Sequence, residues 1–441
     1  MSLTPPMSVQ KLRTALHAKA KESPKQRFHA LYDKVYRADI LAYAYSCCRA
    51  NKGAAGVDNQ TFADIESYGR EKWLGELTQE LRNKTYQASA VRRVYIPKPD
   101  GKQRPLGIPT VRDRVVQTAA MLVFEPIFEA DLQPEQYAYR PQCSALDAVV
   151  RVHGLLNTGH SQVVDADLSG YFDSIPHAEL MKSVARRVVD GAMLHLIKMW
   201  LEAPVEETDE RGNTQRTTRN RNKGCGTPQG APISPLLSNL YMRRFVLGWK
   251  QLGHEKRLDA RIVNYADDLV ICCRNTAHKA MDAMQEMMGR LKLTVNEAKT
   301  QVCSVPDDTF DFLGYTFGRC YSWKDGKPRI GTKPSKKRVS KVLRDISEMT
   351  SRRYVQMEAE EMVLRLNRVI VGWARYFCRG FVSRAYQHID RHARHRLRQW
   401  LRAKHKLPRI DYKKYSDVYV DKELGLVCLA GLRRGVLWAN A

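Results

Sequence analysis

Two adjacent carboxylates lie between apolar segments near the middle of the chain. Asp267 and Asp268 follow Tyr265 and Ala266, and strand-forming residues flank them on both sides, so residues 261–273 are expected to form a β-hairpin with the acids at its tip. Like charges at such a tip repel each other, and Mg²⁺ removes this cost when it binds carboxylates together with substrate phosphates. A solvated acidic turn is the alternative interpretation of this pair taken alone.

A second acidic segment upstream offers matching carboxylates. Asp165 and Asp167 lie two residues apart in a strand expected over residues 162–168, so they share one face of that strand. Three carboxylates on two neighbouring strands can hold two metal ions about 3.5–4 Å apart, an arrangement that drives in-line phosphoryl displacement. The two segments together therefore predict phosphoryl-transfer chemistry.

The charge of the chain points to a polyanionic partner. The 441 residues carry a formal net charge of +26, and the pI is about 9.7. Residues 331–441 contain 26 Lys and Arg against 10 Asp and Glu, so the last quarter is the expected nucleic-acid-binding surface. The apolar fraction of 43% supports an ordinary core and excludes wholesale disorder.

Other sequence features exclude several classes of protein. Ten cysteines occur without any Cys-x-x-Cys spacing, so neither a zinc module nor a disulfide framework is indicated. The N-terminus lacks an apolar signal core, and no apolar run reaches the roughly 18 residues of a membrane span. We therefore expect no membrane partner and a cytoplasmic location.

The elements that would position these residues alternate without a strict βαβ pattern, which predicts an α+β fold. Helices are expected over 1–50, 59–84, 112–129, 177–200, 230–250 and 388–402, hairpins over 91–109 and 261–273, strands over 162–168 and 310–317, a loop over 51–58, a charged loop over 205–224, and a basic linker over 333–338 before an all-helical end.

Seven sequence blocks occur in one order between about Ala30 and Trp400. Besides the two acidic segments, they include the hairpin at 95–109, Gly226–Pro235, Leu291–Thr300, Phe312–Tyr315 and Arg365–Phe377. In content and order they resemble the bacterial group II intron-encoded reverse transcriptases, the maturase family.

The resemblance implies a right-hand polymerase with an antiparallel-sheet palm, mixed fingers and an all-helical thumb. The expected domains are an N-terminal helical extension (1–29), fingers (30–160), palm (161–320), linker and helical thumb or maturase domain (321–400), and a short basic C-terminal tail (401–441). The chain shows no Cys pairs of the endonuclease found in longer family members, so the compact type without that domain is expected.

The resemblance also assigns roles in catalysis. Asp167, Asp267 and Asp268 are the expected catalytic residues, and Asp167, Asp267 and the carbonyl of Leu168 the expected ligands of two Mg²⁺ ions. Asp165 is expected to have a structural role or to support the metal ligands without binding metal itself. The expected nucleotide-binding residues are Lys98 and Arg104 over the triphosphate, Phe172 under the sugar, Gln229 at the sugar side, and Lys299 near the acids. A rigid ring at Phe172 would clash with a 2′-hydroxyl and so favour dNTPs.

The expected nucleic-acid contacts are the arginines of two basic helices near the end of the chain. They are Arg365, Arg368, Arg375, Arg391, Arg394 and Arg398. A charge run is often only a solvated face, yet this density favours phosphate contact.

The implied function is RNA-directed DNA synthesis. The chain would bind an intron or other structured RNA, assist its splicing as a maturase, and copy an RNA template from a DNA primer with dNTPs for retrohoming. The alternative is a domesticated enzyme of the same chemistry that acts in DNA repair or phage defence. The sequence does not set the oligomeric state.

Overall fold

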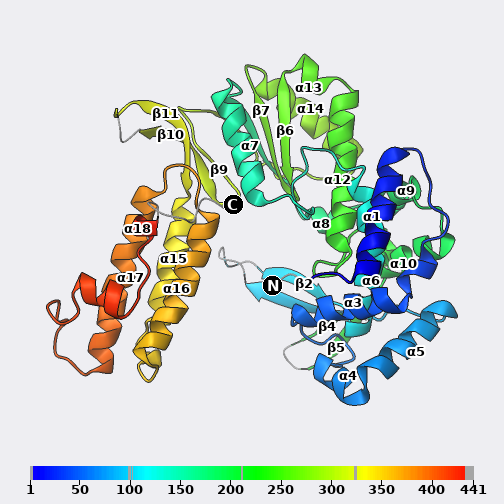
Figure 1. The fold of residues 1–441 in the computed structure, drawn as a ribbon. Helices are drawn as coiled ribbons and strands as arrows, with labels where there is room; N and C mark the ends of the chain where they lie inside the picture. The colour runs from blue at the N-terminus through cyan, green and yellow to red at the C-terminus, as the bar shows by residue number, and fades with distance from the viewer. Residues whose placement is uncertain (1–2, 98–100, 102, 210–211, 322–324, 433–441) are drawn as a thin grey trace. The chain divides into compact units, whose positions relative to one another are not determined.

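The computed structural model describes residues 3–97, 101, 103–209, 212–321 and 325–432 (Figure 1). The chain divides into two compact units, each built from several segments. Unit 1 comprises Met1–Ser144, Ala166–Leu269 and His278–Gln301, and unit 2 comprises Ala145–Asp165, Val270–Ala277 and Val302–Ala441. Both units contain helices and strands, which confirms a mixed α and β architecture.

A buried helix forms the centre of unit 1. Nearly every side chain of α6 (Val111–Glu129) is buried, and α6 packs against α1 and α3, so the helix expected over 112–129 is confirmed. The other helices of this unit are α1 (Met7–Glu22), α2 (Tyr32–Val35), α3 (Ala38–Ala50), α4 (Phe62–Tyr68), α5 (Arg70–Arg82), α8 (Tyr171–Ser174), α9 (His177–Ala185), α10 (Gly191–Leu201), α11 (Arg219–Lys223), α12 (Ser234–Gln251), α13 (His254–Arg257) and α14 (Ala277–Arg290), which begins at the unit boundary.

The first sheet of unit 1 has the strand order β2-β1-β4-β5. The hairpin expected over 91–109 is confirmed as β1 (Val91–Pro97) and β2 (Gln103–Ile108), which pair antiparallel. The charged loop expected over 205–224 is wrong, because it contains a second hairpin, β4 (Val205–Thr208) and β5 (Thr214–Thr217), followed by α11. These short, mostly polar strands show no apolar alternation that would predict them. β4 forms because it pairs in parallel with the edge of β1.

A second difference lies in the helix expected over 177–200, which is two helices, α9 and α10. Asp190 starts α10 as its N-cap and accepts hydrogen bonds from the backbone N–H groups of Ala192 and Met193. The same carboxylate accepts the N–H groups of Leu31 and Tyr32 at 2.8 Å. Asp190 therefore breaks the helix and ties it to a distant part of unit 1.

The acidic segments belong to a sheet with the order β6-β7-β3-β8, whose strands contribute residues to both units. Its strands are β3 (Gln162–Asp167), β6 (Ala260–Tyr265), β7 (Asp268–Cys273) and β8 (Gln301–Ser304). The strand expected over 162–168 and the hairpin expected over 261–273 are thus confirmed. β7 and β3, which carry the two sets of acids, are hydrogen-bonded neighbours.

Unit 2 contains an antiparallel sheet in the order β11-β10-β9, made of β9 (Phe310–Phe312), β10 (Tyr315–Tyr321) and β11 (Pro328–Pro334). The strand-like alternation over 310–317 is interrupted, because Leu313 and Gly314 have φ values of 51° and 83° and turn the chain back. The hairpin that the family resemblance implies at Phe312–Tyr315 is thus present. The expected basic linker at 333–338 is wrong. It is the end of β11 and the first turn of α15, capped by Ser335.

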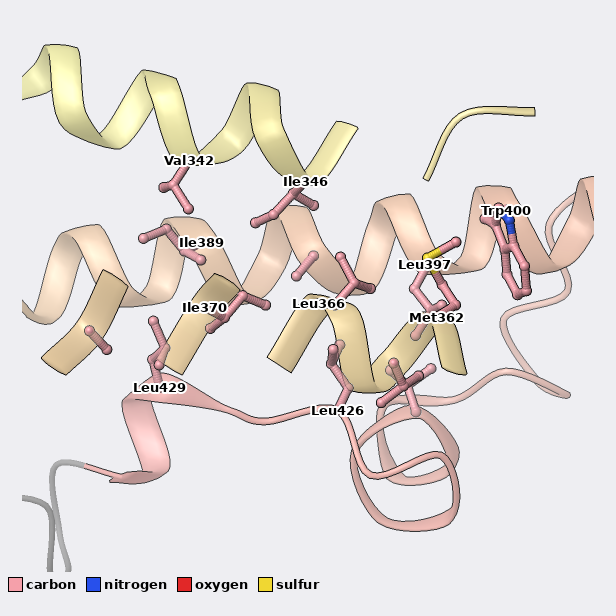
Figure 2. Close-up of a cluster of buried hydrophobic side chains, with 14 of the residues drawn as sticks. Val342, Ile346, Met362, Leu366, Ile370, Ile389, Leu397, Trp400, Leu426 and Leu429 are labelled. Atoms are coloured by element: carbon pink, nitrogen blue, oxygen red, sulfur yellow. The ribbon is translucent and has the colours of Figure 1, made fainter. Parts of the chain in front are cut away.

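The helices of unit 2 that follow its antiparallel sheet share one hydrophobic core, shown in Figure 2. They are α15 (Lys336–Met349), α16 (Ala359–Tyr376), α17 (Ser383–Lys404) and α18 (Leu429–Leu432). Unit 2 also contains α7 (Ala145–Asn157), a 3₁₀ turn at Arg352–Tyr354 and a π turn at Tyr419–Glu423. The segment expected as a basic tail instead contributes Tyr415, Val420, Leu426 and Leu429 to this core. No helix in the described part of the chain has the length and apolar character needed to cross a bilayer.

Burial of the C-terminal segment predicts that it contributes to stability. Leu429 is 0% exposed, so Leu429→Ala should lower the free energy of unfolding by about 2–5 kcal/mol, measured by urea denaturation. The control is Leu364→Ala on α16, where the side chain is half exposed and the change should stay within about 0.5 kcal/mol. Equal effects of the two substitutions would contradict the packing.

Candidate active site

A two-residue turn presents the paired carboxylates. β6 ends at Tyr265, β7 begins at Asp268, and Ala266 between them has a φ of 58°, the positive value that the first central residue of such a turn requires. The fully buried Asn264 donates from Nδ2 to the carbonyls of Ala266 (2.9 Å) and Asp268 (3.3 Å). The backbone on both sides of Asp267 is therefore held from inside the sheet.

Asn264 was missed in the sequence. Its only signal is that it is an amide within an otherwise apolar strand, Ile262-Val263-Asn264. A buried polar side chain in that position needs hydrogen-bond partners, and here the turn supplies them.

Asp167, the last residue of β3, lies among groups that neutralise and orient it. Its Oδ2 accepts hydrogen bonds from Nδ2 of Asn296 (3.0 Å) and from Nζ of Lys299 (3.1 Å). The N–H of Asn296 also donates to the carbonyl of Asp167 at 2.8 Å. The structure thus brings together two predicted residues, Asp167 and Lys299, and adds Asn296, which was not predicted.

The neighbours of Asp167 in sequence are placed differently from each other. Leu168 bridges Val295 in an antiparallel pair whose hydrogen bonds are made by the flanking residues, so the Leu168 carbonyl points away from that partner. Asp165 belongs to unit 2, where burial raises the pKa of the Cys303 thiol to about 11 and the charge of Asp165 adds to this shift.

Residues 135–137, just before Tyr139, run parallel to the end of β6. The N–H of Asn264 donates to the carbonyl of Glu135 (2.8 Å), and the N–H of Tyr137 donates to the carbonyl of Asn264 (3.0 Å). Burial raises the pKa of the Tyr139 phenol, and the charge of Asp267 raises it further. Tyr139 therefore belongs to the site, although nothing in its local sequence distinguishes it from a core aromatic.

The Gly/Pro-rich loop 226–233 links two groups of predicted residues. The N–H of Thr227 donates to the carbonyl of Phe172 (2.7 Å), and the carbonyl of Gln229 accepts the N–H of Gly107 in β2 (2.6 Å). At Gly230, with a φ of 107°, a Cβ would lie 2.5 Å from the carbonyl oxygen of Gly107. Only glycine permits this approach, so the loop is held between the Phe172 segment and the hairpin.

Arg104, one of the two predicted triphosphate cations, lies on that hairpin. Arg104 is exposed on β2 opposite Ile96, and its charge acts on the Tyr139 phenol together with that of Asp267. Lys98 lies outside the described residues. Arg104, Tyr139 and Asp267 therefore share one neighbourhood within unit 1.

The carboxylates suit a cation that is bound together with substrate. No group of three His, Cys, Asp or Glu side chains within the described ranges is close enough to hold a metal ion. Mg²⁺ does not need such a cluster, because it uses one or two carboxylates together with substrate phosphates. Asp167 is paired with the ammonium group of Lys299 at 3.1 Å, so a metal ion at this carboxylate would displace the ammonium group or share the carboxylate with it.

The structure divides the six predicted nucleic-acid contacts into two groups. Arg365, Arg368 and Arg375 on α16 and Arg391 on α17 are exposed. Two others bind the C-terminal segment: Arg394 donates to Asp421 at 2.9 and 2.6 Å, and the buried Arg398 donates to the carbonyl of Tyr415 and pairs with Asp417. Arg394 and Arg398 thus hold that segment, and nucleic-acid contact stays a prediction for the four exposed arginines.

Comparison with known proteins supplies two family matches. The family model for reverse transcriptase (RNA-dependent DNA polymerase) matches residues 96–317, which include the acids, the loop and most of the β1–β2 hairpin. The group II intron maturase-specific domain matches residues 339–418, which include α16 and α17.

Individual relatives agree with these matches. The chain is 32% identical over 368 residues to protein YkfC of Escherichia coli, covering 75% of this chain and 94% of YkfC. It is 30% identical over 296 residues to the group II intron-encoded protein LtrA of Lactococcus lactis, covering 65% of this chain and 46% of LtrA. It is 25% identical over 330 residues to the putative COX1/OXI3 intron 1 protein of Saccharomyces cerevisiae, covering 63% and 38%. The chain therefore spans nearly all of YkfC but less than half of the other two.

The role of Asn264 in the turn predicts a combined loss of stability and activity. Asn264→Ala leaves two turn carbonyls without their donor, so the free energy of unfolding should fall by about 2–4 kcal/mol. Displacement of Asp267 should also reduce catalysis in the fraction that stays folded. Asn222→Ala at an exposed position of α11 is the control and should change neither. An Asn264→Ala protein with ordinary stability would show that the turn does not depend on the amide.

Proposed function

This chain belongs to the family of group II intron reverse transcriptases and maturases, and from this premise we propose that it synthesises DNA on an RNA template. The observation that carries the proposal is the pair of acidic sites on neighbouring strands, Asp167 beside Lys299 and Asp267 on its supported turn. Both lie within the residues matched by the reverse transcriptase model. The reaction is attack of a primer 3′-hydroxyl on the α-phosphate of a dNTP, with release of pyrophosphate.

Catalysis in this proposal depends on electrostatics, because no side chain is needed as a nucleophile. Asp167 and Asp267, with Asp268 and the Leu168 carbonyl nearby, would hold Mg²⁺, which when bound lowers the pKa of the attacking hydroxyl and stabilises the leaving oxygens. Asn296 orients the Asp167 carboxylate, and Lys299 balances its charge before substrate enters. The Asn264 amide keeps Asp267 in a fixed position, so little reorganisation is required at the moment of reaction.

The nucleotide would bind beside the hairpin and the loop, which are in direct contact with each other. Arg104 and Lys98 would contact the triphosphate, and Phe172 and Gln229 the sugar. Support for this assignment comes from the backbone hydrogen bonds that join the loop 226–233 to Phe172 on one side and to Gly107 on the other. These bonds make the parts of the nucleotide site a single connected structure.

Within a right-hand polymerase, residues 30–160 would form the fingers, 161–320 the palm, and 321–400 the linker and thumb. The hydrophobic core around α15, α16 and α17 would make the thumb a rigid support for the exposed arginines. The same surface suits a maturase, since it can bind intron RNA without any contribution from the catalytic acids.

Loss of one acid should separate polymerisation from RNA binding. We expect Asp267→Ala to reduce primer extension on an RNA template by at least about 10²-fold, because transition-state charge loses its main stabilisation. EDTA should abolish extension by the unaltered protein, and added Mg²⁺ should restore it. Binding to a group II intron RNA, and splicing of that RNA, should persist in the variant.

The matched control is Asp307→Ala, where the side chain is 78% exposed and pairs with Arg319. This variant should extend primers at the ordinary rate. Normal extension by Asp267→Ala would exclude the proposed site.

Because four arginines of α16 and α17 are exposed, we expect the affinity for RNA to depend on salt concentration. Arg368→Ala and Arg391→Ala should each weaken binding across sequences and reduce the slope of log affinity against log salt by about 1. Arg398→Ala should instead destabilise unit 2, since that guanidinium is buried against the C-terminal segment. Filter binding at several salt concentrations distinguishes the two groups, and equal slopes for all variants would contradict the division.

A further inference from the structure

Tyr139 combines an unfavourable backbone conformation with an exposed aromatic ring. Its φ is 54°, in the left-handed region that aromatic residues rarely adopt, and 50% of its surface is accessible. Neither property helps the chain to fold, because the strained backbone costs free energy and the exposed ring gains little from burial. Outliers of this kind are concentrated at ligand sites, where surrounding structure maintains them.

The neighbours of Tyr139 hold it in this conformation. Nδ2 of the buried Asn239 donates to the carbonyl of Ala138 at 2.6 Å, and Nε2 of the buried Gln136 donates to the carbonyl of Asn239 at 2.9 Å. On the other side, the Arg140 guanidinium donates to the carbonyl of Gln136 at 2.7 Å. Two buried hydrogen bonds and one partly buried hydrogen bond therefore fix the backbone that presents the ring.

An isolated bridge holds the segment just before Tyr139 beside the end of the strand that leads into the catalytic turn. Gln136 and Asn264 are bridged in parallel, and Tyr139 and Asp267 each lie three residues further along their segments. The charges of Asp267, Asp268 and Arg104 all act on the phenol.

The chemistry of the side chain suits a phosphate. A tyrosine hydroxyl is protonated at neutral pH and is able to donate a hydrogen bond. A phosphate oxygen accepts such a bond, and a charged acceptor makes it stronger than a neutral one does.

We propose that Tyr139 is a nucleotide-binding residue whose hydroxyl donates a hydrogen bond to a phosphate oxygen of the incoming dNTP. The inference rests on the proposed polymerase function and adds a contact to its substrate site. The strained backbone serves to direct the ring toward that substrate.

The test is single-nucleotide incorporation by the full chain on an RNA template with a DNA primer, with one dNTP titrated in Mg²⁺. Tyr139→Phe should raise the apparent Kd for the dNTP about tenfold, the effect of one hydrogen bond, while the maximal rate changes less than about twofold. With a dideoxy-terminated primer, where no reaction occurs, the concentration of the next dNTP needed to stabilise the ternary complex should rise by the same factor. Tyr68→Phe, at a half-exposed tyrosine on α4, should change neither quantity.

Two further variants separate the hydroxyl from the ring and the backbone. Tyr139→Gly removes the strain and the side chain, so it should keep or raise the thermal midpoint yet lose at least as much dNTP affinity as Tyr139→Phe. Tyr139→Leu should match Tyr139→Phe. An unchanged dNTP affinity in Tyr139→Phe overturns the inference, and a loss confined to Tyr139→Leu would assign the role to ring stacking instead. If the unaltered protein incorporates no nucleotide, the polymerase proposal itself fails and this inference fails with it.

Discussion

The hydrogen bonds of one buried amide connect the parts of the candidate active site. Asn264 pairs its backbone with residues 135–137 and its side chain with the turn that carries Asp267. Its Oδ1 has no hydrogen-bond partner within the described ranges, so all the bonding of this side chain goes through Nδ2 to the turn. Burying a polar group costs free energy. Here the buried Asn264 fixes the position of Asp267 relative to β6, and its backbone bonds fix the segment before Tyr139 relative to both.

A second constraint is the close approach of two backbones at Gly107 and Gly230. A side chain at Gly230 would collide with the carbonyl of Gly107, so the absence of a Cβ allows the loop 226–233 to bind the hairpin that carries Arg104. Because the same loop binds the carbonyl of Phe172, the proposed contacts to phosphate and sugar depend on one rigid connection. The prolines of the loop limit its alternatives and so reduce the entropy lost in forming it.

The arginines of the helices in unit 2 have two different surroundings that composition alone does not separate: some pair with the C-terminal segment and others are exposed. Arg394 and Arg398 lie four residues apart on α17, and Asp421 and Asp417 lie four residues apart on the C-terminal segment that they bind. Apolar side chains of that segment enter the core of the helices, so the arginine pairs act together with packing. The arginines that remain exposed are the ones available to a polyanion.

The sequence alone was enough to predict the helix 112–129, the hairpins at 91–109 and 261–273, the acidic strand and the family. Each of these rests on local periodicity or on residues whose order is specific. It was misleading where structure depends on distant partners: β4 forms because the edge of β1 is near, and Asp190 breaks a continuous apolar pattern because residues 31 and 32 supply donors.

The candidate site shows the same division. Asp167 and Asp267 were predicted from their residue types and spacing, whereas the roles of Arg104, Phe172 and Gln229 were predicted from the family resemblance. Asn264, Asn296 and Tyr139, and the structural use of Arg394 and Arg398, were decided only by tertiary structure. The physical reason is that a residue's type sets which bonds it can make, whereas the folded chain determines which partners come within hydrogen-bonding distance.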